Sequence, residues 1–333
     1  MYIYADNAGT TKMSPVAIDA MTKCMNEVFG NPSSLHSTGQ RAAEVLQKAR
    51  EDVAEVLGAD FNEIYFTSGG SEADNQAIRS AALFGAKKGK KHLISTKIEH
   101  HAVLHTLKKL EREGFEVTLL DVGADGIVDP ADVEKAIRED TALVTIMYAN
   151  NEIGTLQPID EIAKICKEKK VTFHTDAVQA FGQVPINVDE CHIDMLSASG
   201  HKIGTPKGIG ILYKKEDVKI SPLIYGSQMN GLRGGTENLP YIMGFAKAVE
   251  LCSVDMKQKK YLTTIKQRDY MIGELLDKIG CKLNGQYTDR LPNNINITFN
   301  QNVMGEAMIY LLDLCDIYVS AGSACNSHSS VPS

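Results

Sequence analysis

Strand-like and helix-like segments alternate along residues 40 to 255, and this alternation limits the chain to a small set of folds. Strands are expected over 63–67, 92–95, 117–120, 143–148, 171–175, 194–198 and 210–213. Helices with apolar residues three and four apart are expected over 38–57, 71–86, 102–113, 131–138 and 159–169. The pattern predicts an α/β fold with a mainly parallel, seven-stranded sheet covered on both faces.

The pattern changes after about residue 255, which predicts a second, smaller unit. A charged helix is expected over 257–279, and strands over 294–299 and 316–320 with a helix over 304–314 between them. A chain of 333 residues is also too long for one small core. We therefore expect a large domain over residues 14–255, and a small α+β domain made of residues 1–13 and 256–333.

Charge and cysteine usage exclude several classes of protein. The net charge is −7, and no basic run marks a surface for direct contact with nucleic acid. No apolar stretch is long enough to span a membrane, and the first residues lack the pattern of a signal peptide. The seven cysteines are scattered without a C-x-x-C pair, which argues against a disulfide framework or a structural zinc site. These features predict a cytoplasmic protein.

A lysine follows the apolar strand expected over 194–198, in the turn Ser199-Gly200-His201-Lys202. A lysine at a strand end can form a Schiff base with an aldehyde if its ammonium is partly desolvated. Ser199 and His201 beside it could donate hydrogen bonds to a phosphate. Taken alone, however, a lysine in a glycine-rich loop is more often a solvated surface residue.

A carboxylate ends another expected strand, about two dozen residues before the lysine. Asp176 could pair with the protonated nitrogen of a pyridine ring, which needs such a partner to act as an electron sink. Gln179 could donate a hydrogen bond to the ring oxygen. The alternative role of Asp176 is a helix N-cap, which does not explain the pair. Asp176 and Lys202, each after an apolar strand, are typical of fold-type I enzymes that use pyridoxal 5'-phosphate (PLP).

Two further segments fit a PLP site. Gly70 and Ser71 begin the helix expected after the strand 63–67, where backbone N–H groups can cradle a phosphate, although a plain helix cap is the alternative. His100 could stack on the pyridine ring and move protons at the substrate carbon. His101 and His105 have the spacing of a metal pair, but no third ligand is apparent, so we expect no metal.

Read together, these segments resemble the cysteine desulfurases of the NifS/IscS type, within the class V aminotransferase group. Four other stretches agree with the resemblance, which covers nearly the whole chain. They are Gly-Asn-Pro-Ser-Ser-Leu-His at 30–36, Ala-Asn-Asn-Glu-Ile-Gly at 149–154, Arg-Gly-Gly-Thr-Glu-Asn at 233–238 and Ser-Ala-Gly-Ser-Ala-Cys-Asn-Ser at 320–327. The resemblance implies the PLP-dependent transferase fold of type I.

The resemblance also implies a role for each matching residue. Lys202 would bind PLP as a Schiff base, Asp176 would pair with the pyridinium nitrogen, and Gln179 would contact the ring oxygen. His100 would stack on the ring, and Asn151 would help to bind the substrate carboxylate. The phosphate would be held by Gly70, Ser71, Ser199, His201 and, from the neighbouring subunit of a homodimer, Thr236.

Cys325 carries the expected activity. An isolated cysteine in a loop of small residues is usually incidental, but the surrounding PLP residues favour a nucleophile. The resemblance implies that Cys325 takes sulfur from L-cysteine as a persulfide, that alanine leaves, and that the sulfur passes to an acceptor protein. That acceptor would be an iron–sulfur scaffold or a tRNA thiolation enzyme. The alternatives are another PLP-dependent carbon–sulfur or carbon–selenium lyase, and a PLP-binding scaffold with weakened catalysis.

Two departures from the family pattern stand out. Gly9 replaces an expected alanine in the segment Asp6–Thr11. The sequence also ends eight residues after Cys325, whereas members of the family continue with a helix, a strand and an arginine that clamps the substrate carboxylate. On this pattern the 333 residues are expected to bind PLP but to bind L-cysteine poorly.

Overall fold

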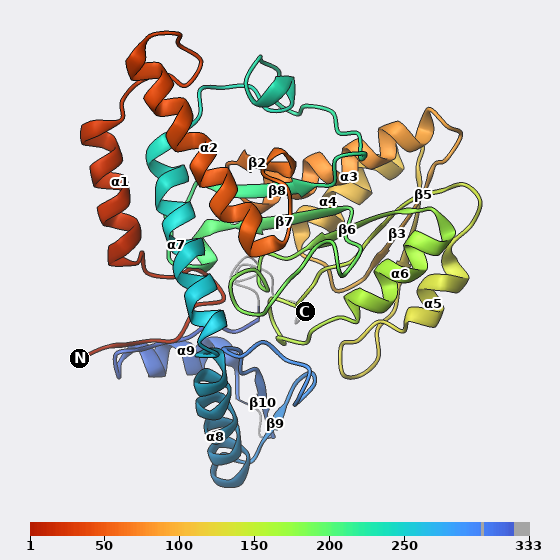
Figure 1. Ribbon diagram of the computed structural model, residues 1–333. Helices are drawn as coiled ribbons and strands as arrows, with labels where there is room; N and C mark the ends of the chain where they lie inside the picture. Colours follow the sequence, from red (N-terminus) through yellow and green to blue (C-terminus); the bar gives the residue numbers. More distant parts are fainter. Residues whose placement is uncertain (301–302, 323–333) are drawn as a thin grey trace.

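A seven-stranded sheet lies at the centre of the protein, with the strand order β2-β8-β7-β6-β5-β3-β4 (Figure 1). The computed structural model describes residues 1–300 and 303–322. The strands are β2 (Ile64–Thr67), β3 (His92–Thr96), β4 (Glu116–Leu120), β5 (Thr141–Thr145), β6 (Thr172–Asp176), β7 (Met195–Ser199) and β8 (Gly210–Lys214). β8 runs antiparallel to both of its neighbours, and the other pairings are parallel. The predicted mainly parallel sheet is therefore confirmed.

Helices cover both faces of this sheet. In a strand, successive side chains point to opposite faces, and Phe173, His174, Thr175 and Asp176 of β6 are all buried. The helix α3 (Gly70–Ala86) contacts β5, β6, β7 and β8. The other helices of this region are α1 (Pro15–Glu27), α2 (Ser37–Leu57), α4 (His101–Arg112), α5 (Pro130–Ala136), α6 (Ile159–Lys169) and α7 (Leu239–Lys257).

The remaining described elements form two small pairs of strands and two helices. β1 (Ile3–Tyr4) pairs in parallel with β11 (Ile317–Tyr318), and β9 (Cys281–Leu283) pairs antiparallel with β10 (Ile297–Phe299). With α8 (Tyr261–Ile279) and α9 (Gly305–Asp313), they lie beyond the end of α7, below the central sheet in Figure 1. No helix within residues 1–300 and 303–322 is long and apolar enough to cross a membrane.

The helix predicted over 257–279 is wrong at its start. α7 ends at Lys257 and α8 begins at Tyr261, because the chain turns at Lys259, where φ is +54°. α7 itself was not predicted, although its start carries a recognisable signal. The side chain of Asn238 accepts a hydrogen bond from the Tyr241 N–H, and Pro240 occupies the first turn.

The sheet provides a test of the fold. We expect Leu143→Ala to lower the free energy of unfolding by about 2–5 kcal/mol, because Leu143 is fully buried in β5 and its truncation leaves a cavity. Leu119→Ala is the matched control, since this side chain of the edge strand β4 is 39% exposed. The control should change stability by only about 0.5 kcal/mol in urea titrations. Equal losses in the two variants would contradict this placement of the core.

Candidate active site

Two adjacent strands bring the predicted carboxylate and lysine to the same edge of the sheet. Asp176 is the last residue of β6, and Ser199 is the last residue of the neighbouring β7. Lys202 follows in a short 3-10 turn, Gly200–Lys202. The carboxyl ends of parallel strands are where open α/β sheets bind their ligands. The local sequence produces this geometry because each apolar strand ends in a turn of small or polar residues.

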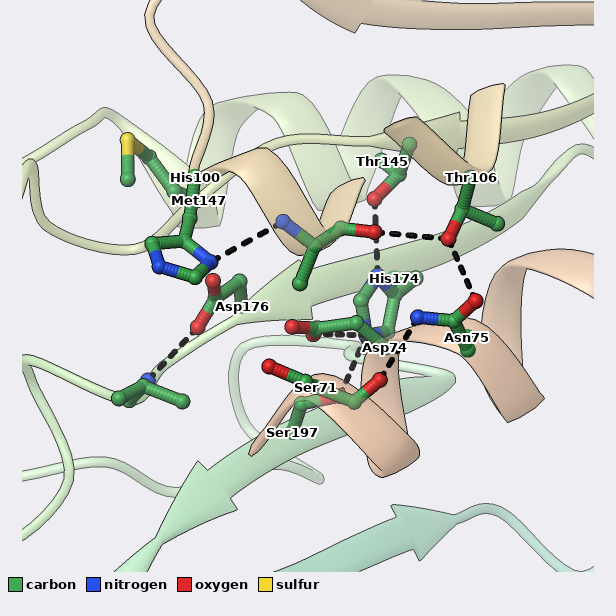
Figure 2. Close-up of polar contacts among 12 residues, drawn as sticks. Ser71, Asp74, Asn75, His100, Thr106, Thr145, Met147, His174, Asp176 and Ser197 are labelled. Carbon is green, nitrogen blue, oxygen red and sulfur yellow. Dashed lines mark hydrogen bonds and ion pairs between the residues drawn. The ribbon is translucent and has the colours of Figure 1, made fainter. Parts of the chain in front are cut away.

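Asp176 is a buried carboxylate whose charge faces two basic groups. Its side chain is 4% exposed, and its Oδ1 accepts a hydrogen bond of 2.9 Å from the Val178 N–H. Burial raises the pKa of Asp176 above its usual value, and this hydrogen bond and the charges of His100 and Lys202 offset only part of the rise. Figure 2 shows the His100 ring beside the Asp176 carboxylate. The site therefore pairs a buried anion with groups that can carry positive charge.

The N-terminal segment lies against the lysine. Lys202 Nζ donates hydrogen bonds to the carbonyl oxygens of Ala8 and Gly9, the latter at 2.8 Å. Gln179 Nε2 donates to the same Ala8 oxygen at 3.1 Å. Sequence reasoning missed these contacts, because a backbone carbonyl has no signature of its own. The altered residue Gly9 was the one signal in this segment.

His201 is fixed by the same segment. Its Nδ1 lies 3.1 Å from the Thr10 hydroxyl, and its backbone oxygen accepts hydrogen bonds from the N–H and the hydroxyl of Thr11. Burial, together with the positive charges of Lys202 and Lys207, lowers the pKa of His201 to about 4. The ring is therefore neutral at neutral pH, and one of its nitrogens can donate a hydrogen bond to an anion.

The start of α3 forms a cradle of backbone groups. The N-cap residue Gly69 provides no side-chain hydrogen bond to the first turn. A Cβ added to Gly70 would lie 2.4 Å from Val178 Cγ2 and 3.6 Å from Ser199 Cβ, so the backbone approaches β6 and β7 closely. Ser71 follows as an exposed residue of the first turn. Helix N-termini with accessible N–H groups bind phosphate.

His100 is the N-cap of α4. Its Nδ1 accepts a hydrogen bond of 3.1 Å from the Ala102 N–H, and burial lowers the pKa of its ring. An open cavity of about 390 Å³ lies between α3 and α4, and both His100 and Ser71 line it. Its lining includes the cations Arg79 and Lys109, which favour an anionic ligand. His105, predicted as a solvated helix residue, is exposed and stacks on His101.

Three predicted residues lie outside this cluster of contacts. Asn151 is in the loop after β5, where Asn150 Oδ1 accepts hydrogen bonds from the N–H groups of Glu152 and Ile153, both at 2.9 Å. Thr236 is exposed between Gly235 and α7. Cys325 lies outside the described residues, so its place relative to Lys202 stays a prediction.

The family of the chain follows from comparison with known proteins. Residues 3–332 match the family described as "Aminotransferase class-V". The chain belongs to the class-V aminotransferase family. "Cysteine desulfurase IscS" of Methanosarcina thermophila is 50% identical to it over 99% of this chain and 81% of the relative. The protein of the same name from Dictyoglomus turgidum is 49% identical over 99% of this chain and 84% of the relative.

Two solved structures are similar to this chain over almost its whole length. A "NIFS-LIKE PROTEIN" has a TM-score of 0.93 and 38% identity, covering 96% of this chain and 88% of the other. "SspA in complex with cysteine" has a TM-score of 0.85 and 37% identity, covering 99% of this chain and 92% of the other. The fold is thus that of the PLP-dependent enzymes of fold type I, as the sequence predicts.

Class-V aminotransferases depend on PLP, and the geometry of this chain fits that cofactor. The buried carboxylate of Asp176 has the chemistry to neutralise a pyridinium nitrogen. Val178 and Ser199 lie against the backbone of Gly70. A Cβ at this position would collide with Val178, so only glycine keeps the backbone N–H groups in place. Lys202 is at the same sheet edge as Asp176 and could hold the aldehyde carbon.

The close packing at Gly70 predicts that a larger residue at this position weakens PLP binding. We expect Gly70→Ala to weaken PLP binding by about tenfold or more, because the new Cβ must displace N–H groups that bind a charged phosphate. Equilibrium dialysis followed by cofactor absorbance would measure the change. Gly273→Ala in α8 is the control, since a Cβ there meets no atom within 4 Å. Unchanged PLP affinity in Gly70→Ala would contradict the assignment of the cradle.

Proposed function

We propose that this protein is a PLP-dependent cysteine desulfurase that converts L-cysteine to L-alanine and passes the sulfur to an acceptor. The observation that carries the proposal is the meeting of Asp176, His100 and Lys202 at the ends of neighbouring elements. It is supported by relatives of that name at about half identity over almost the whole chain. It also agrees with the neighbouring structure whose title records bound cysteine.

The described residues divide the work of holding PLP. Lys202 would hold it covalently, Asp176 would neutralise the ring nitrogen, and Gln179 would donate to the ring oxygen. His100 would stack on the ring. The phosphate would be bound by Gly70, Ser71, Ser199, His201 and Thr236. When bound, PLP would supply an electron sink at the substrate carbon.

The chain's own groups would do the rest of the chemistry. The ring of His100, whose pKa burial lowers, and the amine of Lys202 would move protons at the substrate, since both are near Asp176. Asn151 would bind the substrate carboxylate. The Cys325 thiolate would attack the substrate sulfur. A sulfur–sulfur bond would form as the carbon–sulfur bond breaks, and the carbon would keep the electron pair and take a proton.

The setting of the enzyme follows from the same proposal. The sulfur acceptor would be an iron–sulfur scaffold or a tRNA thiolation enzyme. The six cysteines among the described residues are all free thiols, which fits the reducing cytoplasm.

Residues 14–255 would form the large domain, and residues 1–13 with 256–333 the small one. The pairing of β1 with β11 supports this division, because it joins the first residues to the C-terminal part.

Incubation with L-cysteine tests the function directly. We expect mass spectrometry to find one added sulfur on the Cys325 peptide and an equivalent amount of alanine in solution. Cys325→Ala should still bind PLP, because the thiol does not hold the cofactor, but its alanine production should fall to background. Cys315→Ala is the control, since Cys315 is an exposed cysteine among the described residues, and this variant should behave as the wild type.

Other outcomes would favour the alternatives. Alanine at the wild-type rate from Cys325→Ala would make the protein a lyase that releases sulfide directly. PLP bound without any turnover of L-cysteine would make it a scaffold. Borohydride reduction separates these cases from a failed cofactor assignment, because it should attach PLP to the Lys202 peptide and to no other.

A mixing experiment tests the proposed homodimer. Thr236→Asp should weaken PLP binding by repelling the phosphate, and Lys202→Ala should abolish covalent attachment. If Thr236 serves the neighbouring subunit, a hybrid of the two variants regains one intact site, because one chain supplies Lys202 and the other supplies Thr236. With random pairing of equal amounts, half of the dimers are hybrids with one intact site of two, so borohydride trapping should rise toward about a quarter of the wild-type level. No recovery, or the mass of a single chain in light scattering, would contradict the shared site.

A further inference from the structure

A buried carboxylate next to His100 has no part in the roles described so far. Glu99 is 5% exposed and follows β3 by three residues. Its Oε1 accepts a hydrogen bond of 2.6 Å from the Thr96 hydroxyl. The Met147 N–H, just beyond β5, donates to both carboxylate oxygens at 3.1 and 3.0 Å. One side chain thus ties the turn before α4 to the end of β5.

A second contact joins the same two segments. Asn150 Nδ2 donates a hydrogen bond of 3.0 Å to the backbone oxygen of Ile98. His100 comes directly after Glu99, and its ring accepts the Ala102 N–H. The imidazole is therefore held on both sides, by the anchored backbone before it and by the first turn of α4 after it. Figure 2 shows the hydrogen bond from the first turn of α4 to the His100 ring.

The cost of this carboxylate indicates that its position matters. The pKa of Glu99 is raised to about 8. Burial is the main cause and the charge of Asp176 adds to it, whereas the hydrogen bonds from Thr96 and Met147 lower the pKa. An apolar side chain here would avoid that cost but could not accept the Met147 N–H, and a buried N–H without an acceptor is itself destabilising. A side chain that accepts is required at this turn.

We propose that Glu99 is a positioning residue for His100, fixing the turn that carries the imidazole against the end of β5. The inference rests on the proposed function, in which His100 stacks on the PLP ring. Met147 follows β5, Asp176 ends the adjacent strand β6, and the Tyr148 N–H donates to the Asp176 backbone oxygen at 2.8 Å. Through its hydrogen bonds with Met147, Glu99 therefore fixes the position of the His100 ring relative to β6, the strand that carries Asp176.

The test compares Glu99→Ala and Glu99→Gln in the full chain. Asp194→Ala is the matched control, because Asp194 Oδ2 also accepts a strand N–H, that of Phe173, at 2.9 Å, but at the amino end of β7. Two readouts are made. One is the carbethoxylation rate of His100 by diethyl pyrocarbonate without PLP, read by tandem mass spectrometry against the exposed His105. The other is the visible circular dichroism of bound PLP.

We expect Glu99→Ala to raise the ratio of the His100 rate to the His105 rate by about tenfold, since the hydrogen bonds from Thr96 and Met147 are both lost. The dichroism of bound PLP should fall with it. Glu99→Gln keeps one acceptor oxygen and should show a smaller increase of about threefold, at the lower end of the contribution of a hydrogen bond. Asp194→Ala should leave both readouts at the wild-type level.

An unchanged rate ratio in Glu99→Ala would overturn the proposal whatever the activity of the enzyme. If far-ultraviolet dichroism shows that Glu99→Ala is unfolded, Glu99→Gln decides: a wild-type ratio overturns the proposal, and a raised ratio supports it. A raised ratio in Asp194→Ala would also overturn it, because the effect would then be general. A raised ratio in a protein that makes no alanine would instead reject the proposed function and leave the role of Glu99 intact.

Discussion

The structure of the site depends on the cost of burying the Asp176 carboxylate at the end of β6. A buried anion is tolerated only where hydrogen bonds and opposite charges compensate for lost water. Here the Val178 N–H, His100 and Lys202 provide that compensation, and each comes from a different segment after a strand. These groups can reach the Asp176 carboxylate because β3, β6 and β7 end at the same edge of the sheet.

This arrangement explains why the same edge can bind a charged cofactor. His201 is neutral, because burial lowers its pKa to about 4, so Lys202 and His100 are the basic groups that face Asp176 in the described active-site cluster. The cradle at Gly70 adds the partial positive charge of a helix N-terminus beside Val178 and Ser199. The Asp176 carboxylate would thus face the protonated ring nitrogen of the cofactor, and the positive helix N-terminus would face its phosphate.

Sequence reasoning located the strand ends because apolar runs and small-residue turns are local signals. Asp176 and Lys202 could be placed together on that basis alone, since parallel strands share one carboxyl edge. The contacts of Ala8 and Gly9 with Lys202 could not be predicted in this way, because they join backbone carbonyls to a side chain almost two hundred residues away. β9 was missed because three residues are too few to show a period, whereas the Asn–Leu–Pro start of α7 was readable.

The pairing of Ile3 with Ile317 has a consequence for how the protein is made. The ribosome releases β1 before the central sheet and β11 after it, so β1 waits without its partner while the central sheet is completed. Contacts between such distant residues close slowly, since the loop between them is long. The segment that supplies the Ala8 and Gly9 carbonyls can therefore settle onto Lys202 only late in synthesis. A nascent chain would assemble its sheet well before its active site.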